Sequence, residues 1–351
     1  MSDYLTENKE RNKKGEFDKT DVLSVSGDYG IVNQIELLGR SFAGASVLPY
    51  HVVRHGNIVY TKSPLKEYPY GIVKANTGVD GIVSTLYAVY NIKNNVDAQF
   101  IEYYFSLANR TNRYFKPIVR IGAKHDMKIG NQEVLANKVT FPNLEEQTKI
   151  ASLFRFLDER IATQNKIIDK LQSLIKGIAQ KIVHSNKTNV RLSECVECSS
   201  STLQESDVCE HGAYPVYGAN GIVGYLDNYN TEGEAVYIIK DGSGVGTVSY
   251  VTGKCSATGT LNTLQAKEGY SLQYLYYLLK VFNFEPYKTG MAIPHIYFKD
   301  YGKAKFFCPS YTEQLQYAQS LSAIDSKLLV EKNILTSLSM QKKYLLRQMF
   351  I

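Results

Sequence analysis

Hydrophobic side chains recur at alternating steps of four and three residues in two stretches of the chain. The first stretch contains Ile150, Phe154, Leu157, Ile161, the polar Gln164, Ile168, Leu171, Ile175, Ile178 and Ile182. The second lies 167 residues further on and contains Tyr317, Leu321, Ile324, Leu328, the polar Glu331, Leu335, Leu338, Lys342, Leu345 and Met349. Such steps are typical of a coiled-coil seam and not of the wider apolar stripe of a core helix. The pattern predicts two long helices.

Both stretches begin with the same local signal, in which an N-cap residue is followed three residues later by Glu. The matching residues are Pro142, Asn143, Glu146 and Gln147 in the first stretch and Pro309, Ser310, Glu313 and Gln314 in the second. This spacing indicates a capping box at the start of each helix. We expect a duplicated spacer helix at 141–187 and 308–351, and the simplest arrangement buries both seams in an antiparallel pair within the chain. Pairing of each helix with another molecule is the alternative.

The residues before each spacer helix are typical of a strand-rich domain. In 1–140, runs such as 21–26, 57–61 and 82–90 are rich in β-branched and aromatic residues and are separated by Gly, Asn and Pro. A single amphipathic helix is expected over 98–109. The region 188–307 repeats this plan loosely: 56–60 resembles 233–237, and 99–104 resembles 273–278. The predicted fold class is α+β, with two strand-rich domains separated by two long helices that form an antiparallel coiled coil, and with a pseudo-twofold internal repeat.

Composition adds little to this picture. A formal charge of +6 over 351 residues is only mildly basic, so charge alone does not indicate a nucleic-acid partner. The chain has 27 Tyr, 14 Phe and no Trp, and most of these rings are expected in strand cores. No apolar run is long enough to span a bilayer, and the charged N-terminus is unlike a signal peptide, so a cytoplasmic location without membrane contact is expected.

The order of a variable domain, a Pro-x-x-x-Glu-Gln motif opening a long helix, a second variable domain and a second such helix resembles the specificity (S) subunit of type I restriction-modification systems. The resemblance covers the whole chain and rests on Pro142, Glu146, Gln147 and Asp158, and on Pro309, Glu313, Gln314 and Asp325. One departure is visible, because the residues 190–194 ahead of the second domain have no clear equivalent before Asn8.

The resemblance implies that each strand-rich domain is a target-recognition domain that reads one half of a split sequence in double-stranded DNA. It implies that the coiled coil sets the distance between the halves and docks methyltransferase (M) subunits, which we expect to be two, with restriction (R) subunits in the full complex. S-adenosylmethionine, ATP and Mg are then expected on these partner subunits only. The chain itself is expected to bind no cofactor or metal and to be a non-catalytic subunit of a complex for DNA methylation and restriction.

Candidate DNA-binding residues are those with Lys, Arg, His, Asn, Ser, Thr or Tyr side chains on the loops of the two domains. In the first domain they are Lys62, Ser63, Tyr70, Lys74, Asn76, Arg120, Lys124 and His125. In the second domain they are Tyr217, Asn220, Lys240, Ser243, Lys254, Lys288, Thr289 and His295. A solvated surface position is an equally good interpretation of any one of them, so the prediction concerns the loops more than the individual residues.

Other interpretations stay open. Cys195 and Cys198 with Cys209 and His211 could form a zinc set, although the last pair has an unusual spacing. The Gly-rich run 242–246 lacks the Gly-Lys-Ser/Thr of a phosphate-binding loop and favours a β-turn. The alternative functions are the specificity component of a related restriction-modification type and a non-catalytic coiled-coil scaffold without sequence-specific DNA binding.

Overall fold

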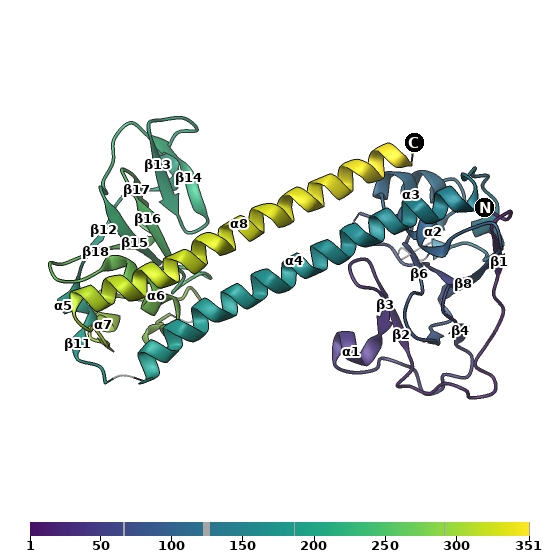
Figure 1. Cartoon of the computed structure of the whole chain (residues 1–351), viewed down its shortest axis with the longest axis horizontal. Helices are drawn as coiled ribbons and strands as arrows, with labels where there is room; N and C mark the ends of the chain where they lie inside the picture. The colour runs from purple at the N-terminus through teal and green to yellow at the C-terminus, as the bar shows by residue number, and fades with distance from the viewer. Residues whose placement is uncertain (66, 122–126, 186, 291, 351) are drawn as a thin grey trace. The chain divides into compact units, whose positions relative to one another are not determined.

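The computed structural model describes residues 1–65, 67–121, 127–185, 187–290 and 292–350. The chain divides into two compact units (Figure 1): unit 1 contains Met1–Thr163 and Leu335–Ile351, and unit 2 contains Gln164–Ile334. The long helices α4 (Leu144–Ser185) and α8 (Tyr311–Met349) each contribute one part to either unit. Each unit therefore combines one strand-rich domain with one part of each long helix.

The domain of unit 1 is built on an antiparallel four-stranded sheet in the order β1-β8-β5-β6. These strands are β1 (Leu5–Glu7), β8 (Tyr87–Ile92), β5 (Ile58–Thr61) and β6 (Val73–Ala75). Three strand pairs accompany the sheet: β2 (Leu23–Ser26) with β3 (Gly30–Asn33), β4 (His51–Val53) with β7 (Gly81–Val83), and β9 (Arg120–Ile121) with β10 (Met127–Lys128). The helices are α1 (Gln34–Leu38), α2 (Ala98–Tyr104), α3 (Ala108–Phe115) and the 3-10 turn Glu133–Leu135.

The domain of unit 2 is built on an antiparallel sheet of the same plan, in the order β12-β18-β15-β16. These strands are β12 (Val196–Ser200), β18 (Leu261–Ala266), β15 (Glu234–Ile239) and β16 (Val248–Thr252). A three-stranded sheet joins β14 (Gly221–Leu226), β13 (Tyr214–Gly218) and β17 (Ser256–Ala257), and β11 (Val190–Arg191) pairs with β19 (Lys305–Phe306). The helices are α5 (Leu192–Cys195), α6 (Leu272–Lys280), α7 (Phe298–Tyr301) and the 3-10 turns Glu205–Asp207 and Glu285–Tyr287.

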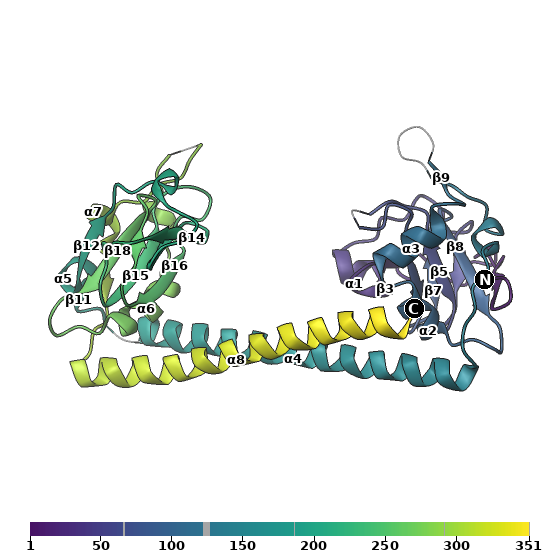
Figure 2. The same ribbon diagram turned by 90° about the horizontal axis from the view of Figure 1, so that it is seen from above.

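The predicted fold class is confirmed, because each unit carries a four-stranded antiparallel sheet with the same strand order and one amphipathic helix after its second-listed strand. In unit 2, α6 lies between the sheet and the long helices, and α2 takes this place in unit 1 (Figure 2). Both helices turn buried aromatic rings toward the core, including Phe100 and Tyr103 in α2 and Tyr274 and Tyr277 in α6.

Two details of the predicted elements are wrong. The single helix expected over 98–109 is two helices, because Ser106 donates both its N–H and its hydroxyl to the carbonyl of Tyr103, and Leu107 is extended. A Ser side chain that bonds the local backbone competes with helix continuation in this way. The run 82–90 is divided between β7 and β8 by a turn in which the Tyr87 N–H donates to the Ser84 carbonyl at 3.0 Å.

A strand does precede Asn8. It is β1, and it pairs with β8 as β12 pairs with β18. Within the described part of unit 1, no strand pair corresponds to β11 with β19. The departure seen in the sequence is therefore the lack of this outer pair and not the lack of a leading strand.

Two buried glutamines attach the long helices to the domains. The side-chain oxygen of Gln147 accepts from the backbone N–H of Asp97, the N-cap of α2, at 3.1 Å. The oxygen of Gln314 accepts from the N–H of Ser271, the N-cap of α6, at 2.9 Å. Both side chains have at most 1% of their surface exposed. The Gln of the repeated motif is thus a buried connection between a long helix and the short helix of its domain.

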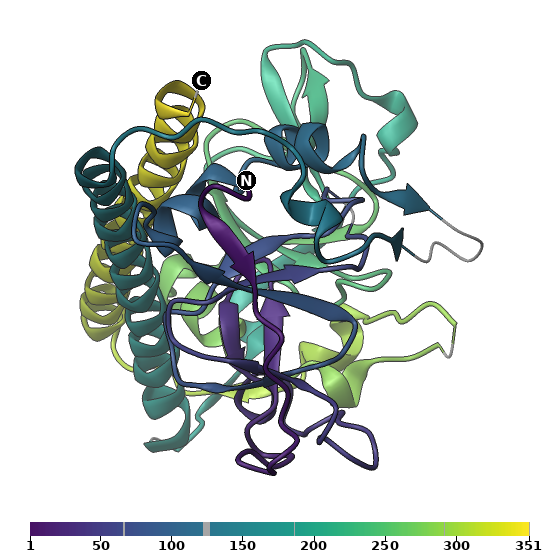
Figure 3. The same ribbon diagram turned by 90° about the vertical axis from the view of Figure 1, so that its right-hand side faces the viewer.

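The two long helices run antiparallel within each unit. In unit 1, Phe154 of α4 stacks on Phe350, which follows α8, and Asp158 of α4 accepts from Lys342 of α8. Figures 1 and 3 both show the last turns of α8, in yellow, beside the first half of α4, in teal. In unit 2, the two predicted polar seam positions meet, because the amide of Gln164 donates to the backbone carbonyl of Glu331 at 3.0 Å and also to its carboxylate.

Burial along α8 departs from the expected seam at both ends. Tyr317 and Met349 each have 37% of their surface exposed. The ring of Tyr317 lies 6.1 Å from that of Tyr274 in α6, so it packs toward the domain of unit 2. At the other end, Leu346 and Phe350 are buried in the core of unit 1 in place of the expected Met349. Near the helix ends, packing against the domains therefore determines which side chains are buried.

Among the described residues, no helix is both long enough and apolar enough to cross a lipid bilayer.

Candidate nucleic-acid interface

The predicted loop residues of unit 1 differ widely in accessibility. Lys62 directly follows β5 and donates to the side-chain oxygen of Asn131 at 2.6 Å, and burial lowers the pKa of its ammonium. Ser63 and Tyr70 are half-buried, and Arg120 is exposed on β9. The predicted contacts Lys124 and His125 lie outside the described residues.

Two of the predicted residues in unit 1 serve the fold. Lys74 forms an ion pair with Glu102 of α2 at 3.1 Å, with 15% and 22% of the two side chains exposed. Asn76 has 1% of its surface exposed, donates to the Val79 carbonyl at 3.0 Å and accepts from the Gly78 N–H at 3.2 Å. Both side chains therefore have partners within the fold.

Unit 1 also contains a basic pocket of about 1110 Å³. It lies where α3, the segment 137–139 and the end of α8 meet, and its cationic lining residues are Arg110, Arg113, Lys138, Lys343 and Arg347. Arg110 lies over the rings of Tyr104 and Phe350 at 5.0 and 5.4 Å, so it helps to close the core. The other four cations are exposed.

The predicted residues of unit 2 fall into three groups. Tyr217 and Asn220 belong to the β13–β14 hairpin, where Asn220 is exposed at the turn. Lys254 lies apart on an exposed turn, 3.6 Å from the carboxylate of Glu232 and over the ring of Tyr229. The third group contains the residues of the 240–243 turn and of the 288–295 loop, which the structure brings together.

Lys240 and His295 line one hollow of about 740 Å³ at the end of the four-stranded sheet of unit 2. We call it the unit 2 hollow; its lining residues are Cys198, Ser199, Ser200, Lys240, Asp241, Asn262, His295, Ile296, Tyr297, Phe298 and Lys299. The neighbouring Ser243 and Thr289 are exposed, and Lys288 pairs with Glu285 at 2.6 Å. The hollow therefore combines β12, the β15–β16 turn and the segment that leads into α7.

The polar groups of the unit 2 hollow are held by hydrogen bonds. The imidazole Nδ1 of His295 lies 2.6 Å from the carboxylate of Asp241, and the backbones of these two residues form a β-bridge. Lys240 donates through Nζ to the hydroxyl of Ser200 at 3.2 Å. Ser200 in turn donates to the buried Asn262 at 3.0 Å. The site is thus an ordered set of donors and acceptors.

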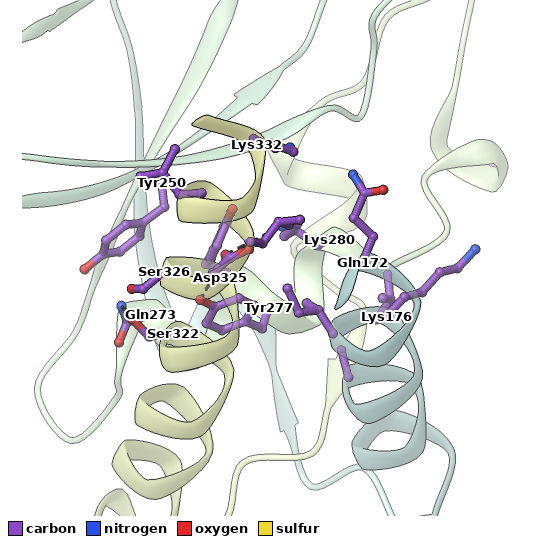
Figure 4. Close-up of a pocket in the computed structure, with 16 residues that line it drawn as sticks. Gln172, Lys176, Tyr250, Gln273, Tyr277, Lys280, Ser322, Asp325, Ser326 and Lys332 are labelled. Carbon is purple, nitrogen blue, oxygen red and sulfur yellow. Dashed lines mark hydrogen bonds and ion pairs between the residues drawn. The ribbon is translucent and has the colours of Figure 1, made fainter. Parts of the chain in front are cut away.

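A second pocket of unit 2 lies between α4, α6 and α8, with a volume of about 780 Å³ (Figure 4). In it the hydroxyl of Tyr277 donates to the carboxylate of Asp325 at 3.1 Å, and the ammonium of Lys280 lies 3.9 Å from the same carboxylate. Burial, and next the charge of Asp325, raise the pKa of Tyr277. Because Tyr103 and Asp158 make the same contact in unit 1 at 2.9 Å, this pair belongs to the repeated connection between domain and helix.

Sequence reasoning missed Asp241, Ser200, Tyr297 and Lys299 in the unit 2 hollow. Asp241 follows Lys240 directly, so a search that also included carboxylate residues next to candidate basic residues would have found it. Ser200 and Lys299 carry no local signal, because only the fold brings them to the same hollow as Lys240. The roles of Tyr103 and Tyr277 were also missed, although both tyrosines lie at the same place in the repeated tract.

The cysteines do not form the suggested zinc set. The sulfur of Cys195 lies 3.9 Å from that of Cys308, and Cys209 is exposed beside β14. In the part of the chain that the structure describes, no three His, Cys, Asp or Glu side chains are grouped as a metal site would require. The run 242–246 forms a turn, as the Val245 N–H donates to the Gly242 carbonyl at 3.2 Å.

Residues 184–340 match the protein family described as the type I restriction modification DNA specificity domain. A segment of 113 residues is 27% identical to the type I restriction enzyme EcoprrI specificity subunit of Escherichia coli. These parts of the chain are therefore similar to the specificity subunits of type I restriction-modification systems. The segment covers 32% of this chain and 28% of the length of the Escherichia coli specificity subunit.

Two solved structures share the fold of this chain. The S subunit of a type I restriction-modification system from M. genitalium superposes with a TM-score of 0.65 at 16% identity, over 99% of this chain and 94% of that one. A chain from a structure on complex assembly and conformational transition of the type I R-M system superposes with a TM-score of 0.52 at 15% identity, over 99% of this chain and 97% of that one. At these low identities the likeness shows a shared fold and nothing more.

Proposed function

We propose that this chain is the DNA-recognition subunit of a type I restriction-modification complex and reads a bipartite target, one half with each domain. The observation that carries the proposal is the repeat itself. Two sheets of the same strand order are joined to two long helices by equivalent buried connections, Gln147 with Gln314 and Tyr103 with Tyr277. The loops at the sheet ends differ, which suits two different half-sites.

In this proposal the chain itself catalyses no reaction. The loops of its two domains would contact phosphates for register and base edges for sequence, and the paired helices would set the spacing. Two methyltransferase subunits would dock on the coiled coil, and restriction subunits would join the full complex. S-adenosylmethionine, ATP and Mg would then be bound by those subunits. The match of residues 184–340 to a type I restriction modification DNA specificity domain supports this assignment.

The first test is a map of methylated bases in the DNA of cells that express the chain with the methyltransferase encoded beside it. A new split motif with two defined halves and an undefined spacer is expected, and it should be missing from cells without the chain. If a soluble complex forms and the DNA acquires no new methylation, the proposal is wrong. A scaffold without DNA binding predicts that outcome, together with no salt-dependent association with duplex DNA.

The modular part of the proposal has its own test. Residues 190–307 would be replaced by the corresponding region of a related specificity subunit, which leaves Gln314 and α8 unchanged. The methylation map should then change in one half of the motif and keep the other half and the spacer. A change in both halves, or in neither, would contradict the assignment of one half-site to each domain.

A further inference from the structure

The unit 2 hollow contains acceptors as well as donors, and this mixture distinguishes it from a phosphate site. Lys240 and Lys299 contribute ammonium groups, whereas Asp241 contributes a carboxylate with 35% of its side chain exposed. A phosphate offers only negatively charged acceptors, so a facing carboxylate would repel it. A base edge in the major groove offers both donors and acceptors, and Lys, Asp and His can each find a partner there.

The Asp241 carboxylate also determines how His295 faces the hollow. An ionised carboxylate only accepts hydrogen bonds, so the proton between Asp241 and His295 belongs to Nδ1. The other ring nitrogen, Nε2, is then the one left to meet a ligand, and 36% of the His295 side chain is exposed. Asp241 therefore acts as a positioning residue for His295.

The backbone around this pair is closely tied. The Gly242 N–H donates to the Pro294 carbonyl at 3.0 Å, and the Ile296 N–H donates to the Lys240 carbonyl at 2.9 Å. Thr289 and His295 exchange backbone hydrogen bonds of 2.9 and 2.8 Å. Groups held in this way lose little conformational entropy when a ligand binds, which favours discrimination between similar ligands. An exposed ring, Tyr297, and Lys299 at 5.3 Å from its centre complete the rim.

The corresponding position of unit 1 is different. By the alignment of 56–60 with 233–237, Lys240 corresponds to the half-buried Ser63, whose neighbour Lys62 directly follows β5. However, Lys62 donates to Asn131, and in the described part of that domain no His–Asp pair lies beside it. The mixed donor and acceptor set is thus a property of the second domain, and it should affect one half-site only.

We propose that the unit 2 hollow reads a base edge in one half of the DNA target, with Lys240 and His295 contacting the base pair and Asp241 positioning His295. This inference rests on the proposed function and adds the residues that determine specificity in the second domain. It also separates them from residues of the same domain that lie outside the hollow, such as Lys254.

The test is the methylation map, measured for the complex with the methyltransferase and the variants His295→Gln, Lys240→Gln and Asp241→Ala. Each should relax the motif at one position of one half, with discrimination against the wrong base falling about 10- to 100-fold. Asp241→Ala and His295→Gln should relax the same position, and the double variant should be no worse than the single ones. Asp241→Asn retains an acceptor for the imidazole and should restore most of the discrimination.

Two matched controls carry the same chemical changes outside the hollow: His211→Gln and Lys303→Gln, both at exposed positions of unit 2. They should leave the motif unchanged. Lys240→Gln keeps the test decisive if a His295 variant misfolds, since the Lys240 ammonium contributes one hydrogen bond of 3.2 Å to Ser200.

Three results would overturn the inference. The first is an unchanged motif in all three variants, and the second is relaxation in both halves of the motif. The third is a loss of DNA affinity that is the same for every sequence, with the slope of log binding constant against log salt concentration reduced by about one, as the loss of a phosphate contact predicts. These outcomes differ from a failure of the proposed function, in which the wild-type chain itself would give no split motif.

Discussion

The two units connect domain and helix through the same Tyr–Asp pair but complete it differently. In unit 1, Asp158 receives hydrogen bonds from Tyr103 of the domain and from Lys342 of the other long helix. In unit 2, Asp325 receives the Tyr277 hydroxyl and faces Lys280, which both belong to α6. The position that corresponds to Lys342 in the repeat is Ile175, which has 5% of its surface exposed.

This difference shows which contacts are the same in the two copies of the repeat. The contact between domain and helix is polar in both units, whereas the contact between the two helices is polar at Asp158 and apolar at Ile175. A partly exposed ion pair adds little stability, while a buried aliphatic side chain adds about 2 kcal/mol or more. Equivalent positions of the two units should therefore respond very differently to substitution.

The largest effect is expected from Ile175→Asp. This change would bury a carboxylate near Asp325 and should lower the free energy of unfolding of unit 2 by about 4 kcal/mol. Urea denaturation followed by hydrogen exchange of unit 2 amides would measure it. Lys342→Asp at the equivalent, more exposed position should cost clearly less. Equal losses at the two positions would remove the distinction between the units.

The next largest effect is expected from a decrease in pH, which should destabilise unit 1 through His51. Burial lowers the pKa of His51 in unit 1 from 6.5 to about 4. The unfolded chain then binds a proton that the folded unit does not, so stability falls as the pH decreases from about 6.5 to about 4, by about 3 kcal/mol at most. Amide exchange in β4 and β7 should accelerate over this range. His51→Gln cannot titrate and should remove this part of the acid sensitivity; an unchanged pH profile in that variant would assign the sensitivity to other groups.

The two glutamine connections should give intermediate effects of similar size. Gln147→Ala leaves the Asp97 N–H and the Asn95 carbonyl without their partner, and Gln314→Ala leaves the Ser271 N–H. Each should cost about 2 kcal/mol, because buried backbone groups lose their hydrogen bonds. Thermal unfolding of the two variants checks this. A loss below about 0.5 kcal/mol in either would mean that water takes over the role of the side chain.

The smallest effect is expected from Lys342→Ile, which makes unit 1 resemble unit 2. The ion pair has 24% and 40% of its side chains exposed, so its loss should cost less than about 1 kcal/mol, and the added apolar contact offsets part of it. Stability should also become less sensitive to salt. A large loss would show that the Asp158 pair is needed for helix pairing in unit 1.

The sequence predicted those parts of the fold that depend on local periodicity. The four-three steps and the N-cap signals predicted both long helices and the equivalent polar positions Gln164 and Glu331, which the structure brings into contact. The break at Ser106 was missed, because a side-chain hydrogen bond to the Tyr103 carbonyl overrides an otherwise helical pattern. In the candidate interface, loop composition indicated Lys240 and His295. Asp241 adjoins Lys240 in the sequence, but Ser200 and His295 come to the hollow from segments far apart in the chain, so no local pattern could indicate the hollow as a whole.

The buried glutamines have a consequence for the exchange of whole domains. Gln147 and Gln314 accept from a backbone N–H of the preceding domain, and every residue other than proline provides this group. A crossover that brings in a foreign domain ahead of Pro309 would therefore preserve the connection whatever side chain the newcomer has at its N-cap. A single exchange of the domain could therefore deliver a complete new set of loops onto unchanged helices.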